Sequence, residues 1–452
     1  MSACDAALSK AKALHIDEYE AFFAERKIIT VRITDSEIAE VKQNQEKSLA
    51  VRIIHQKRIG SATTSNLDKN DVVESALKST SLVKPKNYWR SLPQSAKFPS
   101  LQNVFDQKIE SISGERAADI AYIMINAATK DKRVTAVSGS LNIVFEKIEI
   151  ANSNGLNCTD KATYLAGTIN AESNVGNSTV SGIGDMSSRT TNGFDAESVG
   201  EEASDMCVNS INPQKCESET YSIIFEPYAI GEMLAYVFAS NFNLKIYSEK
   251  RSCFVDKIGG KIAPESFSLI DDPHHPEGLG SKPFDDEGIL TIPRPLIDRG
   301  IFSGTFSDSF YAFKENKEST GNASRAGSPV GRSAQPIPFP SPHNLMISGK
   351  GVSKDEIIKN TKKGLLVGRL WYTYAVNPER GDFSCTARSG IKIIENGRIK
   401  SPGKPVRIVH NLPVLLQNIS SIGNDTRNVL NWHSLPTITP SVQVEGIKAV
   451  SI

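Results

Sequence analysis

Short β-rich runs joined by turn dipeptides constrain the fold of this chain more than any other sequence feature. Asp35-Ser36 and Gln56-Lys57 fall where turns would connect antiparallel neighbours. Asn154-Gly155 and Asn396-Gly397 are hairpin signals, because both residue types tolerate the positive φ of a two-residue turn. The pattern therefore predicts antiparallel sheets. The runs are Tyr19–Ile33, Glu37–Lys42, Leu49–Ile54, Arg58–Thr64, Val134–Ser138, Leu141–Ala151, Thr163–Ala171, Ser178–Gly182, Ile391–Ile394 and Val406–Val409.

Helical segments are interspersed with these runs. Apolar residues recur at helical spacing in Asp68–Ser79 and Gly114–Lys130. A polar stretch, Asp185–Asn192, leads into a further helix expected around Val199–Ser210. Ser353 and Glu356 have the spacing of a capping box, in which each side chain satisfies a backbone N–H of the other, and predict a helix running to about Lys363.

The order of these elements predicts an α+β protein of several domains. We expect mixed α/β layers with an antiparallel sheet in the N-terminal part, followed by a large β-rich C-terminal domain. The predicted divisions are an N-terminal α+β domain at 1–84, a proline-containing linker at 85–104, a middle α+β domain at 105–215 and the β-rich domain at 220–452.

Charge and composition limit the classes of partner. Lys and Arg total 52 against 51 Asp and Glu, so there is no electrostatic case for nucleic acid or an anionic membrane as a main partner. No run reaches the roughly 18 apolar residues of a membrane span, and no signal-peptide core is recognisable. None of the six cysteines forms a CxxC pair, which excludes a zinc ribbon. We expect a soluble, cytoplasmic protein.

The segment Tyr221–Lys250 reads as a strand, a proline-capped turn and an amphipathic helix. A zinc site built on one helix needs two imidazoles and a Glu that polarises the bound water. No His occurs anywhere in this segment. The helix, expected over Tyr228–Ser240, should place its apolar face in the core or at an interface, and that face is formed by Ile230, Leu234, Val237 and Phe238.

Several other groups of residues could carry chemistry. His274-His275 lies between acidic residues and prolines, which favours a polar loop over a metal site. Asp285-Asp286-Glu287 could supply paired carboxylates, although its context favours a turn. Cys385 could act as a nucleophile only with a His nearby. A small polar loop that could line a cleft and bind a carboxylate or a peptide backbone, or could be a plain surface loop, contains Thr320, Gly321, Asn322 and Arg325.

Six segments, in order along nearly the whole chain, resemble the TldD/PmbA family, whose members were named modulators of DNA gyrase. One run, SEIAEVKQNQEKSLAVRII, resembles the first-domain strands of the family, and EIANSNGL resembles its middle-domain hairpin. The C-terminal segments are KPFDDEGI, KESTGNA, IIENGRIKSP and NISSIGND.

The resemblance implies two branches with different metal chemistry. TldD-like members carry HExxxH on the helix after the first C-terminal strand and a zinc-binding Cys near the chain end. PmbA-like members, also called TldE, lack these ligands and pair with a TldD-like subunit. Here the motif positions fall near Tyr236, Val237 and Asn241, and Asn424–Ile452 contains no Cys. Glu232 lies on the same helix and is interpreted as a polar-face residue.

The leading hypothesis is therefore a non-catalytic, TldE-like subunit of a cytoplasmic zinc metallopeptidase that degrades or processes peptides and unfolded proteins. This chain would bind no cofactor, and a TldD-like partner would hold the zinc in a heterodimer. The alternative is a homodimeric peptide-binding or scaffold protein without protease activity. A third idea is metal-independent hydrolysis by Cys385 with one of the scattered His residues.

Overall fold

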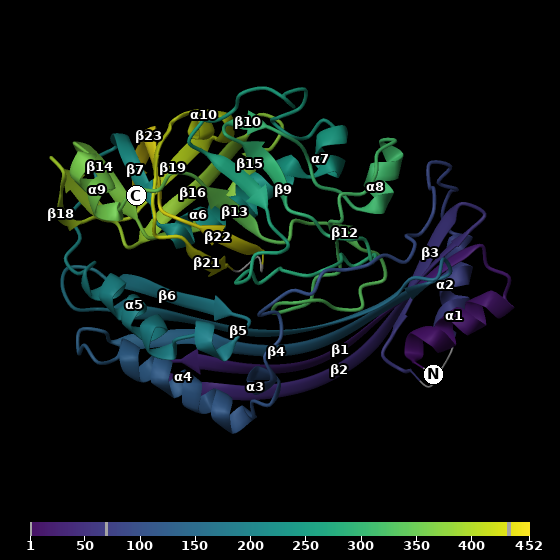
Figure 1. The fold of residues 1–452 in the computed structure, drawn as a ribbon. Coiled ribbons are helices and arrows are strands. Elements are labelled where there is room, and N and C mark those ends of the chain that lie inside the picture. Colours follow the sequence, from purple (N-terminus) through teal and green to yellow (C-terminus); the bar gives the residue numbers. More distant parts are fainter. Residues whose placement is uncertain (1, 68–70, 432–434) are drawn as a thin grey trace.

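A six-stranded antiparallel sheet, here called the N-terminal sheet, spans the first part of the chain (Figure 1). The computed structural model describes residues 2–67, 71–431 and 435–452. The strands lie in the order β3-β2-β1-β4-β5-β6. Because β1 pairs with β4, the segments 1–84 and 105–215 contribute to one sheet. The strands are β1 (Glu18–Thr34), β2 (Glu37–His55), β3 (Arg58–Thr64), β4 (Ala136–Asn152), β5 (Asn157–Ser173) and β6 (Val180–Ser188).

The predicted turns join neighbouring strands of this sheet. Asp35 and Ser36, between β1 and β2, both have positive φ, as do Gln56 and Lys57 between β2 and β3. Gly155, between β4 and β5, has φ +83°. Positive φ at the centre of a two-residue turn matches the right-handed twist of the flanking strands. These hairpin predictions are confirmed.

Several strands, β2 and β6 among them, are longer than the sequence pattern indicated. β2 continues without a break between Lys42 and Leu49, through a polar and largely exposed stretch. Its backbone pairs with β1 throughout, so the ladder continues where no apolar alternation marks it. β6 runs past Gly182 to Ser188 because it pairs with β5 to that point.

Helices pack on both ends of the N-terminal sheet. α1 and α2 lie at one end, and α4 packs against the face opposite the C-terminal part of the chain, with α5 beside it (Figure 1). The predicted start of α2 at Asp68 lies outside the described residues. The bounds are α1 (Ala3–Ala13), α2 (Asp71–Thr80), α3 (Gln107–Glu110), α4 (Gly114–Ala128) and α5 (Ala196–Val208), with a 3-10 turn at Thr191–Gly193.

The C-terminal part contains a nine-stranded sheet in the order β15-β16-β19-β23-β7-β14-β17-β18, with β20 paired to β23. Asn396 and Gly397, both with positive φ, form the predicted turn between β17 and β18. The strands are β7 (Glu219–Phe225), β14 (Lys363–Val367), β15 (Arg369–Asn377), β16 (Asp382–Ser389), β17 (Lys392–Glu395), β18 (Arg398–Pro402), β19 (Val406–Asn411), β20 (Ile419–Ile422) and β23 (Val442–Ser451).

A second six-stranded sheet has the order β10-β9-β8-β13-β22-β21, and β11 pairs with β12. Its strands are β8 (Ser268–Asp271), β9 (Arg294–Asp298), β10 (Ile301–Phe302), β13 (Leu345–Ser348), β21 (Arg427–Leu430) and β22 (Pro436–Thr439), and the separate pair is β11 (Ala323–Ser324) and β12 (Phe339–Pro340). The helices of this part are α6 (Pro227–Met233), α7 (Leu244–Ser248), α8 (Ser309–Lys314), α9 (Lys354–Asn360) and α10 (Leu412–Gln417).

The largest core cluster fills the C-terminal part and includes the apolar residues of the Tyr228–Ser240 segment. Ile230, Leu234, Val237 and Phe238 are each at most 3% exposed, which confirms their prediction as core. The predicted α9 is present, and Ser353 Oγ accepts from Glu356 N, but the helix ends at Asn360 because Lys363 already belongs to β14. The α+β class, with an N-terminal antiparallel sheet and a β-rich C-terminal part, is confirmed.

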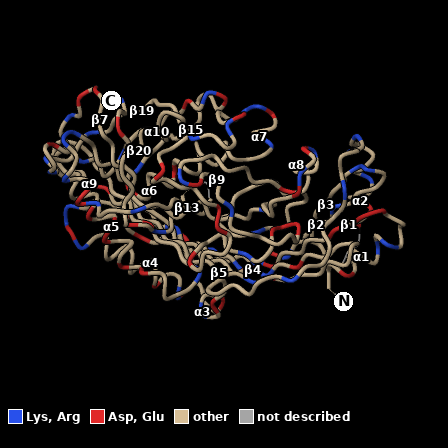
Figure 2. Tube along the Cα trace, turned by 45° about the horizontal axis from the view of Figure 1, so that its top comes forward, with Lys and Arg blue, Asp and Glu red and all other residues tan. Residues whose placement is uncertain are grey.

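The C-terminal elements lie over one face of the N-terminal sheet (Figure 1). Residues 85–104, all described, form neither helix nor strand. Trp89 within them is buried and donates its indole N–H to Glu18, so this stretch packs against the sheet. Figure 2 shows basic and acidic residues interspersed along the trace. Among the described residues, no helix is long and apolar enough to cross a membrane.

Candidate functional site

The segment that the sequence predicts as one helix is divided into three short pieces. α6 ends at Met233, a π-helical turn covers Leu234–Phe238 and a 3-10 turn covers Ala239–Phe242. Pro227 occupies the first turn of α6, where its missing N–H has no cost. The prediction of a single amphipathic helix is therefore wrong. Its predicted place after the first C-terminal strand, β7, is confirmed.

The π turn matters for the spacing of the motif positions. Tyr236 and Asn241 are five residues apart, and a regular α-helix would place such residues about 140° apart around its axis. A π turn has more residues per turn and a 3-10 turn has fewer. Tyr236–Phe238 lies in the π turn and Ala239–Asn241 in the 3-10 turn, so the two effects on the angle oppose each other.

The side chains at these positions do not fit a zinc ion. Val237 has no donor atom and is 2% exposed in the core. Asn241 is used structurally, because its Nδ2 donates to the Val237 carbonyl at 2.8 Å and its Oδ1 accepts from Cys253 N at 3.1 Å. Tyr236 is half-buried. In the described residues, no group of three or more His, Cys, Asp or Glu side chains is arranged to hold a metal ion.

A cavity of about 430 Å³ lies beside this segment, at the edge of the nine-stranded sheet. β15 is that edge strand, and among the described strands it pairs only with β16. Tyr372 has φ +49°, which is uncommon for a bulky residue, and the register with β16 shifts around it. Three of the six lining residues are aromatic and three are polar, and such a mixture is found in small-ligand sites. The lining consists of Glu232, Tyr236, Arg369, Trp371, Tyr372 and Thr373.

Glu232 is the lining residue of this cavity whose pKa is shifted most. It is 5% exposed, which corrects its interpretation as a polar-face residue, because β15 packs over α6 at this point. Burial raises the pKa of Glu232 to about 8, against the opposing effects of Arg369 and of the Leu370 N–H, which donates to Glu232 Oε2 at 2.9 Å. Thr373 Oγ1 and Arg369 Nε are buried and have no hydrogen-bond partner among the residues that the structure describes. The sequence alone gave no signal for this set, because β15 lies more than a hundred residues beyond α6.

The predicted cleft loop, residues 320–325, is fixed by hydrogen bonds to other residues of the same chain. Thr320 Oγ1 accepts from Ser307 N at 2.6 Å, and Asn322 Nδ2 donates to Asp271 at 2.6 Å. The Gly321 carbonyl accepts from His343 Nε2 at 2.8 Å. Burial, aided by Lys282, lowers the pKa of His343 to about 3, so the imidazole is neutral. Peptide contact by this loop remains a prediction.

Arg325, the fourth residue of that prediction, is 1% exposed and belongs to a buried ionic network. Its guanidinium pairs with Glu20 of β1, and its backbone N–H donates to Asp286 at 2.6 Å. Arg52 of β2 pairs with both Glu20 and Glu287, each at 2.7 Å. These hydrogen bonds occupy groups of Arg325 that a peptide carboxylate would need.

The acidic run Asp285-Asp286-Glu287 forms the predicted turn, closed by Asp285 N donating to the Ile289 carbonyl at 2.8 Å. All three carboxylates are nevertheless fully buried in the same network. Burial alone would raise the pKa of Glu287, but Arg52 and the hydrogen bonds from Ser309 together outweigh it and lower the pKa. The turn thus fixes the C-terminal part on the N-terminal sheet.

The remaining sequence candidates are separate from one another. His274 Nε2 contacts Thr291 Oγ1 at 3.1 Å, and His275 Nδ1 accepts from Glu277 N at 3.3 Å, so the two rings are engaged locally. Cys385 is fully buried, and burial, with Glu232 nearby, raises the pKa of its thiol well above its ordinary value. These surroundings disfavour a thiolate nucleophile.

Comparisons with known proteins cover nearly the whole chain. Models of the PmbA/TldA metallopeptidase match as domain 1 at residues 19–81, as the central domain at 107–211 and as the C-terminal domain at 218–451. The chain is 25% identical over 437 residues to the metalloprotease PmbA of Escherichia coli O157:H7, covering 92% of this chain and 90% of that relative. It is 26% identical to a TldD homologue of Buchnera aphidicola, covering 87% and 83%.

Solved structures give the same result. The chain is similar to the crystal structure of TldE from Thermococcus kodakarensis, with a TM-score of 0.90, 25% identity and coverage of 99% of this chain and 100% of that one. A Thermotoga maritima structure, named for modulation of a DNA gyrase, has a TM-score of 0.87 at 22% identity with 99% coverage of both chains, and it supports the fold alone.

Proposed function

Because this chain belongs to the PmbA/TldD metallopeptidase family, we propose that it is the subunit without zinc ligands in a two-chain peptidase. A TldD-like partner would hold the zinc and carry out hydrolysis of peptides and unfolded proteins. One observation carries this proposal: the positions expected for the zinc motif hold Tyr236, Val237 and Asn241, and the last two serve the core and the backbone.

The role proposed for this chain is to complete the peptide-binding surface of its partner. The cavity beside Tyr236 supports this role, since it is concave and contains polar groups, Thr373 Oγ1 and Arg369 Nε, that lack partners among the described residues. The edge strand β15 beside it has one side on which the structure describes no neighbouring strand, where an extended segment of another chain can pair.

We place this activity in the cytoplasm. All six cysteines are unpaired and buried, as is usual for proteins of reducing compartments. No link to DNA gyrase is proposed, because nothing in the site argues for one.

Co-expression with the TldD-like homologue of the same genome tests the proposal. We expect the two chains to co-elute in size-exclusion chromatography, and the pair to cleave an unfolded, fluorescently labelled casein faster than the partner alone. This chain alone should not cleave it. A partner with His-to-Ala substitutions in HExxxH is the matched control, and its pair should be inactive.

The proposal fails if the chains elute separately and the partner cleaves casein equally well alone. Elution of this chain as a homodimer in the presence of the partner would favour the scaffold alternative. Cleavage that persists with the zinc-motif variant would assign catalysis to this chain.

A further inference from the structure

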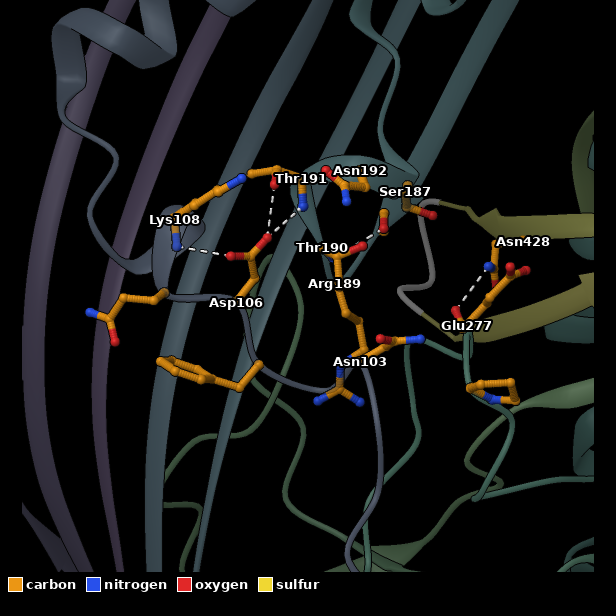
Figure 3. Close-up of a pocket in the computed structure, with 15 residues that line it drawn as sticks. Asn103, Asp106, Lys108, Ser187, Arg189, Thr190, Thr191, Asn192, Glu277 and Asn428 are labelled. Atoms are coloured by element: carbon orange, nitrogen blue, oxygen red, sulfur yellow. Dashed lines mark hydrogen bonds between the residues drawn. The ribbon is translucent and has the colours of Figure 1, made fainter.

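A second cavity, of about 780 Å³, lies between the N-terminal sheet and the C-terminal part, away from Tyr236. Its walls come from segments far apart in the sequence: residues 103–108, the turn after β6, the loop at 276–277 and β21. Figure 3 shows their polar side chains, with Arg189 extending among them toward Asn103. Such convergence of polar groups from separate segments is typical of a binding site.

Arg189 is 3% exposed and its position is fixed by the protein. Its backbone carbonyl accepts from Thr163 Oγ1 at 2.8 Å, and its guanidinium lies 4.9 Å from the centre of the Tyr164 ring. Its Nη1 donates to the Ser281 carbonyl. The side chain is therefore held from three sides in one orientation.

The other two nitrogens of Arg189, Nε and Nη2, are buried and have no hydrogen-bond partner in the part of the chain that the structure describes. These two atoms form one edge of the planar guanidinium, and their N–H groups point in parallel. This is the edge that receives both oxygens of a carboxylate or phosphate in a bidentate contact. The Nε–H and Nη2–H groups of Arg189 thus have the geometry that binds an oxyanion.

Three other buried arginines are paired with carboxylates of the chain, whereas Arg369, like Arg189, has no ion pair among the described residues. Arg52, Arg325 and Arg332 each form an ion pair with at least one carboxylate of the chain. Among the described residues, no carboxylate forms an ion pair with Arg189. A buried cation without a counter-charge is unfavourable, so an anion from outside the chain would stabilise this arrangement.

A neighbouring hydroxyl extends the site. Ser187 Oγ, beside the cavity, is also buried without a hydrogen-bond partner among the described residues, and its O–H can donate to an oxyanion. The nearby carboxylate of Asp106 is already engaged, because it accepts from Thr191 N at 2.8 Å, Thr191 Oγ1 at 2.9 Å and Lys108 N at 2.9 Å (Figure 3). These neutral donors leave its negative charge in place, but within the part of the chain that the structure describes it forms no ion pair with Arg189.

We propose that this cavity binds a small oxyanion, a carboxylate or a phosphate, through a bidentate contact with Arg189 supported by Ser187. The site does not depend on the function proposed above, since it lies elsewhere and needs no partner chain.

Isothermal titration calorimetry of the full chain tests this with three probes at constant ionic strength: inorganic phosphate, N-acetylglycine and its neutral amide. At least one of the two anions should saturate a single site, and the amide should not bind. Arg189→Lys keeps the charge but loses the parallel N–H groups, and should weaken binding by about tenfold or more. Ser187→Ala should weaken it without disturbing the Tyr164 contact. Lys362→Ala, at an exposed residue outside the cavity, should change it by less than about twofold.

The outcome also identifies the source of the oxyanion. Binding of phosphate alone would support a phosphorylated ligand, and binding of N-acetylglycine alone would support the carboxylate of a peptide or metabolite. The proposal is overturned if neither anion saturates, or if Arg189→Lys and Ser187→Ala, folded by circular dichroism, both bind as the original chain does.

Discussion

Arg325 forms an ion pair with Glu20, although 305 residues separate them in the sequence. Both side chains are 1% exposed, and Arg52 and Glu287 continue the network between the N-terminal sheet and the acidic turn. The pairing therefore joins the two parts of the chain through charges that water does not reach.

Removing one member of this network should destabilise the folded chain. We expect Arg325→Met to lower the free energy of unfolding by roughly 3–5 kcal/mol, because it removes a buried charge from the network and leaves Glu20 with Arg52 alone as its partner. Urea unfolding followed by tryptophan fluorescence measures this. Arg116→Ala is the control, since Arg116 pairs with Asp119 on the surface and such pairs contribute about 0–1 kcal/mol. Equal losses for the two variants would refute a structural role for the network.

Asn241 provides a second test of whether the residues at the motif positions stabilise the fold. Asn241→Ala leaves the buried Cys253 N–H and Val237 carbonyl without their side-chain partners, which should cost roughly 1–3 kcal/mol. Ser240→Ala, one residue away and exposed, should have little effect on the same urea transition. If the two variants unfold alike, Asn241 is not needed for the local structure.

Glu232 should make stability depend on pH in an unusual direction. Its pKa is about 8 in the folded chain and ordinary when unfolded, so the unfolded state releases its proton first as pH rises. The stabilising contribution of the neutral acid is complete below the ordinary value and is lost as the pH approaches 8. Glu232→Gln should therefore gain stability relative to the original chain at pH 8 compared with pH 4.5. A constant difference between them across this range would contradict the assignment.

Cys385 should be inert in the folded chain. Burial and its raised pKa predict that iodoacetamide at pH 8 modifies Cys385 only after unfolding in urea, as mass spectrometry of tryptic peptides would show. Rapid modification in the folded state, accompanied by loss of peptidase activity in the complex, would revive the thiol hypothesis.

Local chemistry explains why the turns could be predicted. Asn396-Gly397 and the pair Asp35-Ser36 adopt positive φ through their own residue types and neighbours, so a short window contains the signal. The middle of β2 could not be predicted in this way. Its polar side chains are exposed, and only the pairing of its backbone with β1 keeps it extended.

The candidate site, too, could be predicted from the sequence only in part. The missing zinc ligands at Tyr236, Val237 and Asn241 can be read directly from the sequence. The burial of Glu232 and Arg325 could not, because their neighbours come from β15 and β1, which only the tertiary fold brings to them. The π turn is likewise a tertiary result, since no glycine or proline occurs within Leu234–Phe238.

Zinc content, measured by elemental analysis on the purified chain alone and in complex with its TldD-like homologue, tests the central claim most directly. The account predicts essentially no zinc in the isolated chain and about one zinc per pair in a complex that cleaves peptides. Stoichiometric zinc in the isolated chain, retained through dialysis against a weak chelator, would contradict it and would make this chain a metal-binding subunit in its own right.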